Sequence, residues 1–406
     1  MKNQKTFLTV IYFLSFISLG LITGALGPAI PTFAENTATT LKEVSSLFIF
    51  SSLGYLAGSF MAGILFHKIP GNRILFIVLI MMGVGIGLIP VIRSLWLLVG
   101  ILFILGIAQS NLDVGENTLL IWLHGSKVAP YMNSLHFFFG LGSFVAPLII
   151  AQSLRVTETI NLSFWIMAAL IVLPAPFLLR LKSPVNPDFV VHPIDSLEKV
   201  RPKAGKGVIV LLVLFFLFFT GAELTFANWI YTYSIQAGFT NVETGAYLTS
   251  AFWGSFMLGR FLGIGLSRKL TNRQIMWIDV LGGILSLVMI LILPNSSVAL
   301  WVCSITYGFF IATGFPTGIN LAEELNAVSS RITSYLFIAA SIAGMTSPWI
   351  VGQFIESRGP SVLIWVVLAN LIMAALVMVG FQIMKGRSSY PAPQPKEIRP
   401  LSTSTD

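Results

Sequence analysis

Charged residues are scarce in this sequence: only 10% of its 406 residues are Asp, Glu, Lys or Arg, whereas 55% are hydrophobic. The mean hydropathy of +0.86 excludes an ordinary soluble globular protein and indicates an integral membrane protein. The single cysteine, Cys303, excludes a disulfide within the chain. The patterns HExxH, GxSxG and GxxxxGK do not occur and the four histidines are scattered, so we expect no enzyme, no metal centre and no cofactor beyond a coupling ion.

Twelve apolar runs are long enough to cross the membrane as α-helices, which takes about 18 to 25 residues for roughly 30 Å of hydrocarbon. Their approximate limits are 7–33, 43–66, 73–92, 96–122, 128–151, 161–180, 207–236, 244–267, 274–294, 298–323, 330–355 and 361–384. They are too long and too uniformly apolar for barrel strands. The sequence therefore predicts an all-α polytopic membrane protein, with the first run retained as a span because it lacks a small-residue cleavage site.

The two halves of the chain repeat each other. A polar segment at 181–206 separates six runs (1–180) from six more (207–384), and a tail follows at 385–406. At an offset near 200, Gly54 falls on Gly254 and Asn72 on Asn272; at 201, "PLIIAQ" (147–152) falls on "PWIVGQ" (348–353). We predict two homologous six-helix bundles joined by a cytoplasmic linker.

The basic residues predict the orientation in the membrane. With the N-terminus in the cytoplasm, nineteen of the 24 Lys and Arg lie in cytoplasmic segments, four lie outside, and Arg260 lies within a span. This asymmetry accounts for the net charge of +8 without a nucleic-acid partner. We expect both termini in the cytoplasm, a bacterial inner membrane because no sorting tail is evident, and a monomer whose partners are the lipid bilayer and a small solute.

Several motifs carry a family resemblance. As a whole the chain resembles the major facilitator superfamily, whose gating motif falls at "GILFHKIPGNR" (63–73) and "GIGLSRKLTNR" (263–273), with His67 and Ser267 where the family has Asp. Four stretches are similar to the fucose:proton symporter family and its sodium-dependent glucose transporter relatives: "LDVGEN" (112–117), "NSLHFFFGLGS" (133–143), "GAELTFANWIYTY" (221–233) and "GRFLG" (259–263). The resemblance implies a major facilitator fold and a sugar carrier with its site near the midplane, between the halves.

Two carboxylates interrupt the fourth run. Asp113, Glu116 and Asn117 stand at i, i+3 and i+4, which predicts that all three share one face of the helix. Each carboxylate near the bilayer centre costs about 2.5 to 3.5 kcal/mol, so it needs a partner or a water-filled cavity. Three roles stay open: a structural hydrogen-bonded pair, a proton carrier, or a sodium ligand formed by Asp113 with the Asn117 oxygen. Glu223 offers a further coupling acid from the opposite half.

Other polar and aromatic side chains in the runs are candidates for binding or gating. Amides, an imidazole and aromatic rings would hold a polyhydroxylated solute, although the aromatic residues could equally serve packing. The predicted binding residues are Gln109, Asn117, Asn133, His136, Asn228, Trp229, Tyr233 and Asn320. We expect Arg260 to make an ion pair or a carbonyl contact that stabilises one conformer, and Glu323 and Glu324 to pair with loop cations. The predicted gating residues are Lys68, Arg73, Arg260, Arg268, Arg273, Glu323 and Glu324.

The leading functional interpretation is a secondary active transporter of a monosaccharide or similar small polar solute, which works by alternating access and is coupled to protons or sodium. An exporter of drug-like or siderophore-like molecules is the alternative, because the predicted spans are rich in aromatic residues. A membrane-embedded enzyme or a sensor without transport activity ranks behind both.

Overall fold

The computed structural model describes residues 2–185, 204–325 and 330–387, in which the long elements are all helices and no strand occurs. The first half contains α1 (Lys2–Asn36), α2 (Leu41–Val44), α3 (Ser46–Lys68), α4 (Gly71–Leu88), α5 (Leu95–His124), α6 (Ala129–Thr157), α7 (Asn161–Val172) and α8 (Ala175–Arg180). The second half contains α10 (Lys206–Gln236), α11 (Val242–Leu266), α12 (Asn272–Ile292), α13 (Ser297–Ile311), α14 (Gly314–Glu324), α15 (Ser330–Arg358) and α16 (Val362–Arg387).

The predicted all-α membrane fold is confirmed. Eleven helical segments are long and apolar enough to cross a membrane; the eighth predicted run is α11, a single helix of 25 residues that carries Arg260. Two runs are interrupted rather than continuous. The sixth breaks near Pro174 into α7 and α8, because proline cannot supply a backbone N–H to a helix, and the tenth breaks at Ala312 and Thr313 into α13 and α14.

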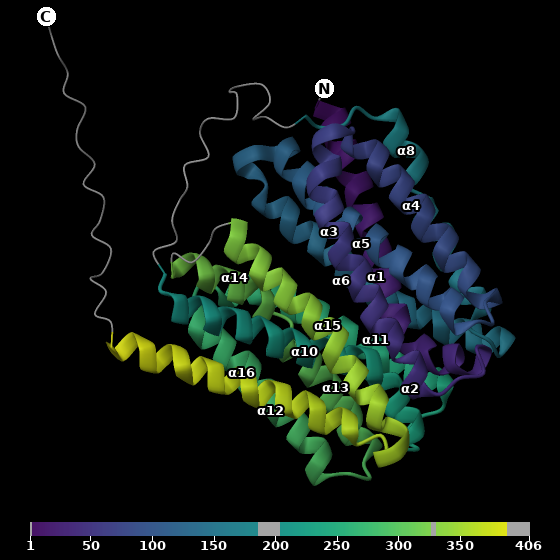
Figure 1. Ribbon diagram of the computed structural model, residues 1–406, viewed down its shortest axis with the longest axis vertical. Helices are drawn as coiled ribbons and strands as arrows, with labels where there is room; N and C mark the ends of the chain where they lie inside the picture. The colour runs from purple at the N-terminus through teal and green to yellow at the C-terminus, as the bar shows by residue number, and fades with distance from the viewer. Residues whose placement is uncertain (1, 186–203, 326–329, 388–406) are drawn as a thin grey trace, which may run out of the picture.

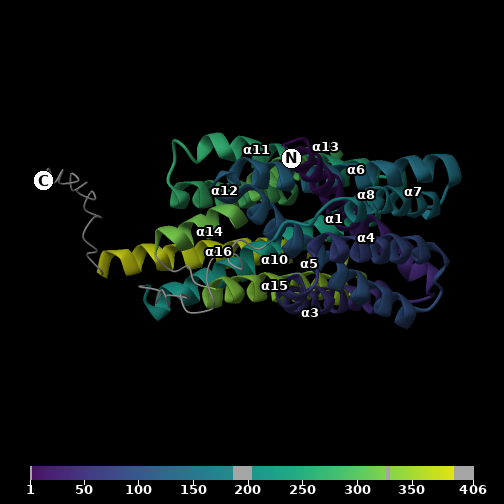
Figure 2. The same cartoon turned by 90° about the horizontal axis from the view of Figure 1, so that it is seen from above.

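The helices form two groups that follow the predicted halves (Figure 1). Seen from above, α3 lies beside α15 along one edge, α6 lies beside α11 along the opposite edge, and α1 and α10 lie between them (Figure 2). The predicted boundaries of the linker and tail fall mostly on residues 186–203 and 388–406, outside the described residues, and stay predictions.

Close backbone approach holds each group together. A Cβ atom at Gly58 of α3 would lie 2.5 Å from the carbonyl oxygen of Ile107 in α5. In the second half, a Cβ at Gly308 of α13 would lie 2.5 Å from the carbonyl oxygen of Phe252 in α11. Glycine is therefore required at both positions, and the two halves use the same device for helix packing in the membrane.

Several hydrogen bonds between the two groups lie at one end of the molecule, which we call the α2 end. It comprises α2, the first turns of α3 and α11, and the last turns of α6 and α15. The Gln353 amide donates to the Lys42 carbonyl at 3.2 Å and to the Ser45 hydroxyl at 3.1 Å, and the Gln152 amide donates to the Tyr247 hydroxyl at 2.7 Å. These two glutamines are equivalent positions of the sequence repeat.

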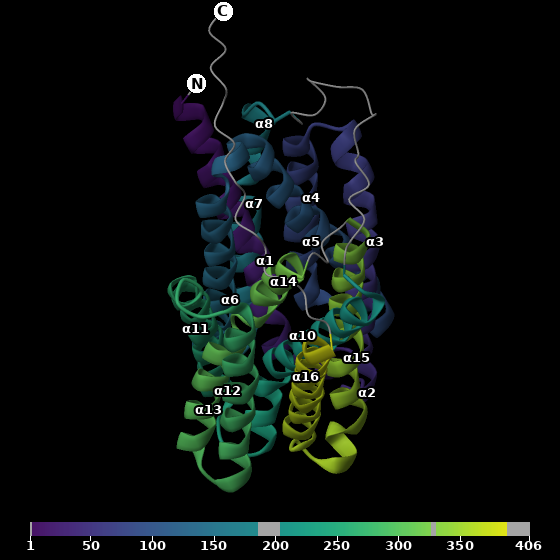
Figure 3. The ribbon, with the colours of Figure 1, turned by 90° about the vertical axis from the view of Figure 1, so that its left-hand side faces the viewer.

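The opposite end, which we call the α8 end, carries the first turn of α1, helix α8, and the first turns of α6 and α15 (Figure 3). In Figure 1 the two groups meet near α2 and diverge from it. The structure is thus a conformer in which the two groups are joined at the α2 end.

Candidate functional site

Asp113 lies at the centre of a polar site in the first half. Its carboxylate accepts a hydrogen bond from the hydroxyl of Tyr55 in α3. The Asn117 amide nitrogen donates to the Asp113 Oδ1 at 2.9 Å and to the Asp113 carbonyl at 2.8 Å. All three side chains are half-buried, so the carboxylate is held by two donors while its surroundings stay open on one side. Tyr55 was not among the predicted site residues; its signal in the sequence is a hydroxyl in an apolar span, where it needs a partner.

The orientation of Asn117 bears on the predicted sodium site. The Asn117 amide nitrogen donates to the carbonyl oxygen and to the Oδ1 of Asp113, so the Asn117 side-chain oxygen is turned away from the carboxylate. A cation between Asp113 and the Asn117 oxygen would require the amide to turn. The predicted sodium site at Asp113 and Asn117 stays a prediction, as does a proton carrier at Asp113.

Arg260 of α11 reaches the same region from the second half. Its Nε donates to the Ala312 carbonyl at 3.3 Å, a carbonyl that lies in the break between α13 and α14. The guanidinium stacks over Phe256 of its own helix, 4.5 Å from the ring centroid, and lies 5.8 Å from the ring of Phe139 in α6. A carbonyl contact was one of the two contacts predicted for Arg260. The two aromatic rings lie next to its charge and interact favourably with it.

Arg260 links the charges of both halves. It interacts electrostatically with Asp113 in α5 and with Glu223 in α10. His136 of α6 also lies within range of its charge. Glu223 is 8% exposed, whereas Asp113 and Arg260 are half-buried. One cation at the boundary between the halves therefore faces a carboxylate from each.

Glu116 does not share the face of Asp113, and that part of the prediction is wrong. Successive residues turn by about 100° around a helix, so i+3 and i+4 fall on opposite sides of the position i. Asn117 stays beside Asp113, whereas Glu116 turns toward α1 and is 0% exposed. Neither of its carboxylate oxygens has a hydrogen-bond partner.

The neutral candidates are divided between accessible and enclosed positions. Asn133, His136 and Asn320 are exposed, and Gln109 and Asn228 are half-buried; the Asn228 amide donates to the Leu224 carbonyl at 2.8 Å. Trp229 is 0% exposed and its indole N–H donates to the Pro348 carbonyl at 2.8 Å. Its ring packs against Phe48 of the first half, at 5.9 Å between centroids, and Tyr233 is buried against Phe239. In this conformer both aromatics serve packing, and their role in binding stays a prediction.

Apart from Arg260, the predicted gating residues lie at the α8 end. Lys68, Arg73, Arg268 and Glu323 are exposed. Glu324 accepts a hydrogen bond from the amide of Asn272 at 3.2 Å, rather than from the arginine or lysine that we expected, because Asn272 begins the neighbouring helix. The Arg273 Nε has no partner. A latch among these residues stays a prediction for a conformer closed at this end.

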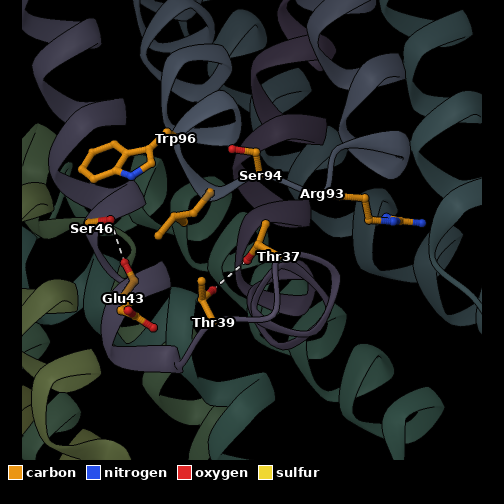
Figure 4. A pocket seen from close by; sticks show the side chains of 8 residues that line it. Thr37, Thr39, Glu43, Ser46, Arg93, Ser94 and Trp96 are labelled. Atoms are coloured by element: carbon orange, nitrogen blue, oxygen red, sulfur yellow. Dashed lines mark hydrogen bonds between the residues drawn. The ribbon is translucent and has the colours of Figure 1, made fainter.

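A surface pocket of about 570 Å³ opens at the α2 end of the first half (Figure 4). Thr37, Thr39, Glu43, Ser46, Arg93, Ser94, Leu95 and Trp96 line it. Some of its polar side chains form hydrogen bonds with other lining residues. The Thr37 and Thr39 hydroxyls are hydrogen-bonded at 2.7 Å, and the Ser46 hydroxyl donates to the Glu43 carbonyl at 2.7 Å. It lies on the outer surface, and none of the acids of the central site borders it.

A helical membrane protein of two repeated halves, with buried charges facing one another across the boundary, has the architecture of a secondary transporter. The chain belongs to the Major Facilitator Superfamily, whose family model matches residues 8–348. It is a transporter of that superfamily and not an enzyme.

Relatives and solved structures agree with this assignment. The sodium-dependent glucose transporter 1 of Xenopus laevis is 28% identical over 379 residues, covering 87% of this chain and 77% of the relative. The human protein of the same name is 27% identical, covering 83% and 71%. A crystal structure of a D-xylose-proton symporter aligns with a TM-score of 0.72 at 15% identity, covering 91% of this chain and 96% of that one. The nucleoside transporter NupG aligns with a TM-score of 0.68 at 17% identity, covering 94% of this chain and 99% of that one.

Proposed function

We propose that this chain carries a monosaccharide-sized, polyhydroxylated solute across the membrane by alternating access, driven by a cation gradient. The names of its relatives support sugar as the solute class and an ion as the driving partner. Several predicted amide, imidazole and carboxylate groups of the spans are half-buried or exposed, and such groups supply donors and acceptors for hydroxyl groups. The orientation that we propose places both termini in the cytoplasm of a bacterial cell, so this conformer faces inward.

The observation that carries the proposal is the position of Arg260, opposite Asp113 of the first half and Glu223 of its own half. When Asp113 is ionised, its attraction to Arg260 opposes separation of the halves at this level. When Asp113 is protonated, that attraction is lost while the Tyr55 and Asn117 contacts can rearrange. A proton on Asp113 therefore lowers the cost of moving one half against the other, which couples ion binding to the change of access.

Proteoliposome transport tests the proposal. Labelled hexoses are offered under imposed proton or sodium gradients to the unmodified chain, to Asp113→Asn, and to Glu158→Gln, a control that removes an exposed carboxylate at the end of α6. We expect gradient-driven accumulation in the unmodified chain and the control. Asp113→Asn should lose accumulation and keep sugar exchange at equal concentrations, because binding and rocking persist without the charge change.

Two results would overturn parts of this scheme. If Asp113→Asn accumulates sugar as well as the unmodified chain, then Asp113 is not the coupling residue. If no hexose moves under any gradient while a dye is expelled, the chain is an exporter of apolar or drug-like compounds instead.

A further inference from the structure

The motif "GRFLG" (259–263) of α11 packs against the break between α13 and α14. A Cβ atom at Gly259 would lie 2.4 Å from the carbonyl oxygen of Phe309, near the end of α13. A Cβ atom at Gly263, one turn later, would lie 2.4 Å from the Cγ2 of Thr313, in the break itself. A side chain at either position would push α11 and the break apart, so the two glycines permit the close approach.

Arg260 follows the first of these glycines and binds the break directly. Pro316 has no backbone N–H to donate to the Ala312 carbonyl four residues earlier, and the Arg260 Nε donates to that carbonyl instead at 3.3 Å. The position of the Ala312 carbonyl therefore helps to set where the guanidinium lies at the boundary between the halves.

A buried acid of α12 holds the next residue of the break. Asp279 is 4% exposed, and its carboxylate accepts a hydrogen bond from the Thr313 hydroxyl at 2.6 Å. A threonine at a helix N-cap usually bonds to the first turn of its own helix. Thr313 is the N-cap of α14 and makes no such bond, so its hydroxyl serves the contact with α12 instead. A buried carboxylate in a membrane protein is costly to keep, which indicates that this contact has a function.

We propose that Asp279 is a positioning residue of the transporter: by binding Thr313 it fixes the break, and the break holds Arg260 where it faces the acids of both halves. The two contacts are made by neighbouring residues, Ala312 and Thr313, so a movement of this segment that breaks one contact also disturbs the other. The importance of Arg260 for coupling rests on the proposed function, whereas the linkage between the two contacts does not.

Thermal unfolding tests the linkage without any transport measurement. Thr313→Val removes the hydroxyl donor while keeping the shape of the side chain, and Arg260→Met removes the contact with the Ala312 carbonyl. Each variant should lower the unfolding midpoint. Because both changes release the same segment, the double variant should lose less than the sum of the two single losses.

Thr306→Val is the matched control for this comparison. Thr306 of α13 is half-buried, as Thr313 is, but its hydroxyl donates to the Val302 carbonyl of its own helix at 2.8 Å. Its loss in midpoint should therefore add to that of Arg260→Met. Should Arg260→Met fail to fold, Arg260→Lys replaces it, since lysine keeps the charge and lacks the Nε.

Proteoliposome transport tests the consequence for coupling. Thr313→Val and Asp279→Leu should lower gradient-driven accumulation several-fold while sugar exchange at equal concentrations continues, because only the position of Arg260 is lost. Thr313→Ser keeps the hydroxyl donor and should accumulate sugar as the unmodified chain does.

Additive losses in midpoint for Thr313→Val and Arg260→Met would overturn the linkage. Full accumulation by Thr313→Val or by Asp279→Leu would overturn the positioning role. If the unmodified chain accumulates no hexose, the proposed function fails, and the unfolding midpoints still decide whether Thr313 and Arg260 act through one segment.

Discussion

Removing one glutamine should weaken the closed end of the transporter. Gln353 of α15 donates to the Lys42 carbonyl at 3.2 Å and to the Ser45 hydroxyl at 3.1 Å, both in the other half. Gln353→Ala deletes both bonds while leaving the buried packing near Gly352 in place. Since these bonds exist only while the α2 end is joined, their loss should favour conformers in which that end is open.

The size of the shift follows from the bonds lost. A hydrogen bond in a folded protein contributes about 0.5 to 1.5 kcal/mol net, so the variant loses about 1 to 3 kcal/mol from the joined state. Because about 1.4 kcal/mol is a tenfold change in an equilibrium constant, the ratio of open to joined conformers should rise by roughly 5- to 150-fold. Gln152→Ala removes the single 2.7 Å bond to Tyr247 and should raise the ratio by about 2- to 12-fold. The two sites lie on different helix pairs, so their effects should add.

Electron spin resonance between two labels can measure the ratio. Glu158, after the end of α6, and Val242, at the start of α11, are exposed on opposite halves at the α2 end. Cysteines at these positions carry the labels, with Cys303 replaced by serine. We expect a longer-distance population that grows from the unmodified chain to Gln353→Ala and again in the double variant. Gln236→Ala, which removes an exposed glutamine at the end of α10, should leave the distribution unchanged. Identical distributions in all four proteins would refute the reasoning.

Three further predictions concern the site, the packing and the orientation. Tyr55→Phe removes the hydrogen bond to the Asp113 carboxylate, worth about 1.5 to 3 kcal/mol for a charged acceptor, and should reduce gradient-driven accumulation while sugar exchange continues, as measured in proteoliposomes. Gly58→Val should lower the free energy of unfolding by about 1 to 3 kcal/mol, because its Cβ would lie 2.5 Å from a carbonyl oxygen. Gly63→Val places its Cβ in open space and should leave the free energy of unfolding unchanged. A cysteine replacing the exposed Lys127 should react with an impermeant maleimide only from the cytoplasmic side, and reaction in intact cells would reverse the proposed orientation.

The fold was predictable because its signals are long and repeated. Hydropathy identified the membrane-crossing segments, because a span needs about 20 consecutive apolar residues and the apolar runs of soluble proteins are shorter. Neither helix break was predicted, although a proline signals each in the sequence: Pro174 at the first and Pro316 just after the second. Pro316 has no backbone N–H to donate to the Ala312 carbonyl four residues earlier, and Arg260 binds that carbonyl instead.

The site was only partly predictable, because helical spacing places a residue to within a wide arc of the helix surface. The spacing joined Asp113 to Asn117 correctly and Glu116 wrongly, although i+3 and i+4 are equally near in sequence. Tyr55 lies 58 positions from Asp113, and no local pattern relates the two. Trp229 was predicted to bind a sugar ring because its side chain is aromatic with a polar N–H. In the structure its ring packs against Phe48 of the other half, and its N–H donates to the Pro348 carbonyl.

The internal repeat places equivalent contacts from both halves at the α2 end. Gln152 and Gln353 come from equivalent positions of the two halves, and each reaches the half to which it does not belong. Each also lies about one and a half turns beyond a proline within its helix, Pro147 in α6 and Pro348 in α15. A proline leaves a backbone carbonyl free of its usual helical partner and permits a local bend. A bend at either proline would change the angle at which the last turn of its helix meets the other half. Because the two contacts lie on different helix pairs, a change at either proline should weaken its own contact and leave the other in place.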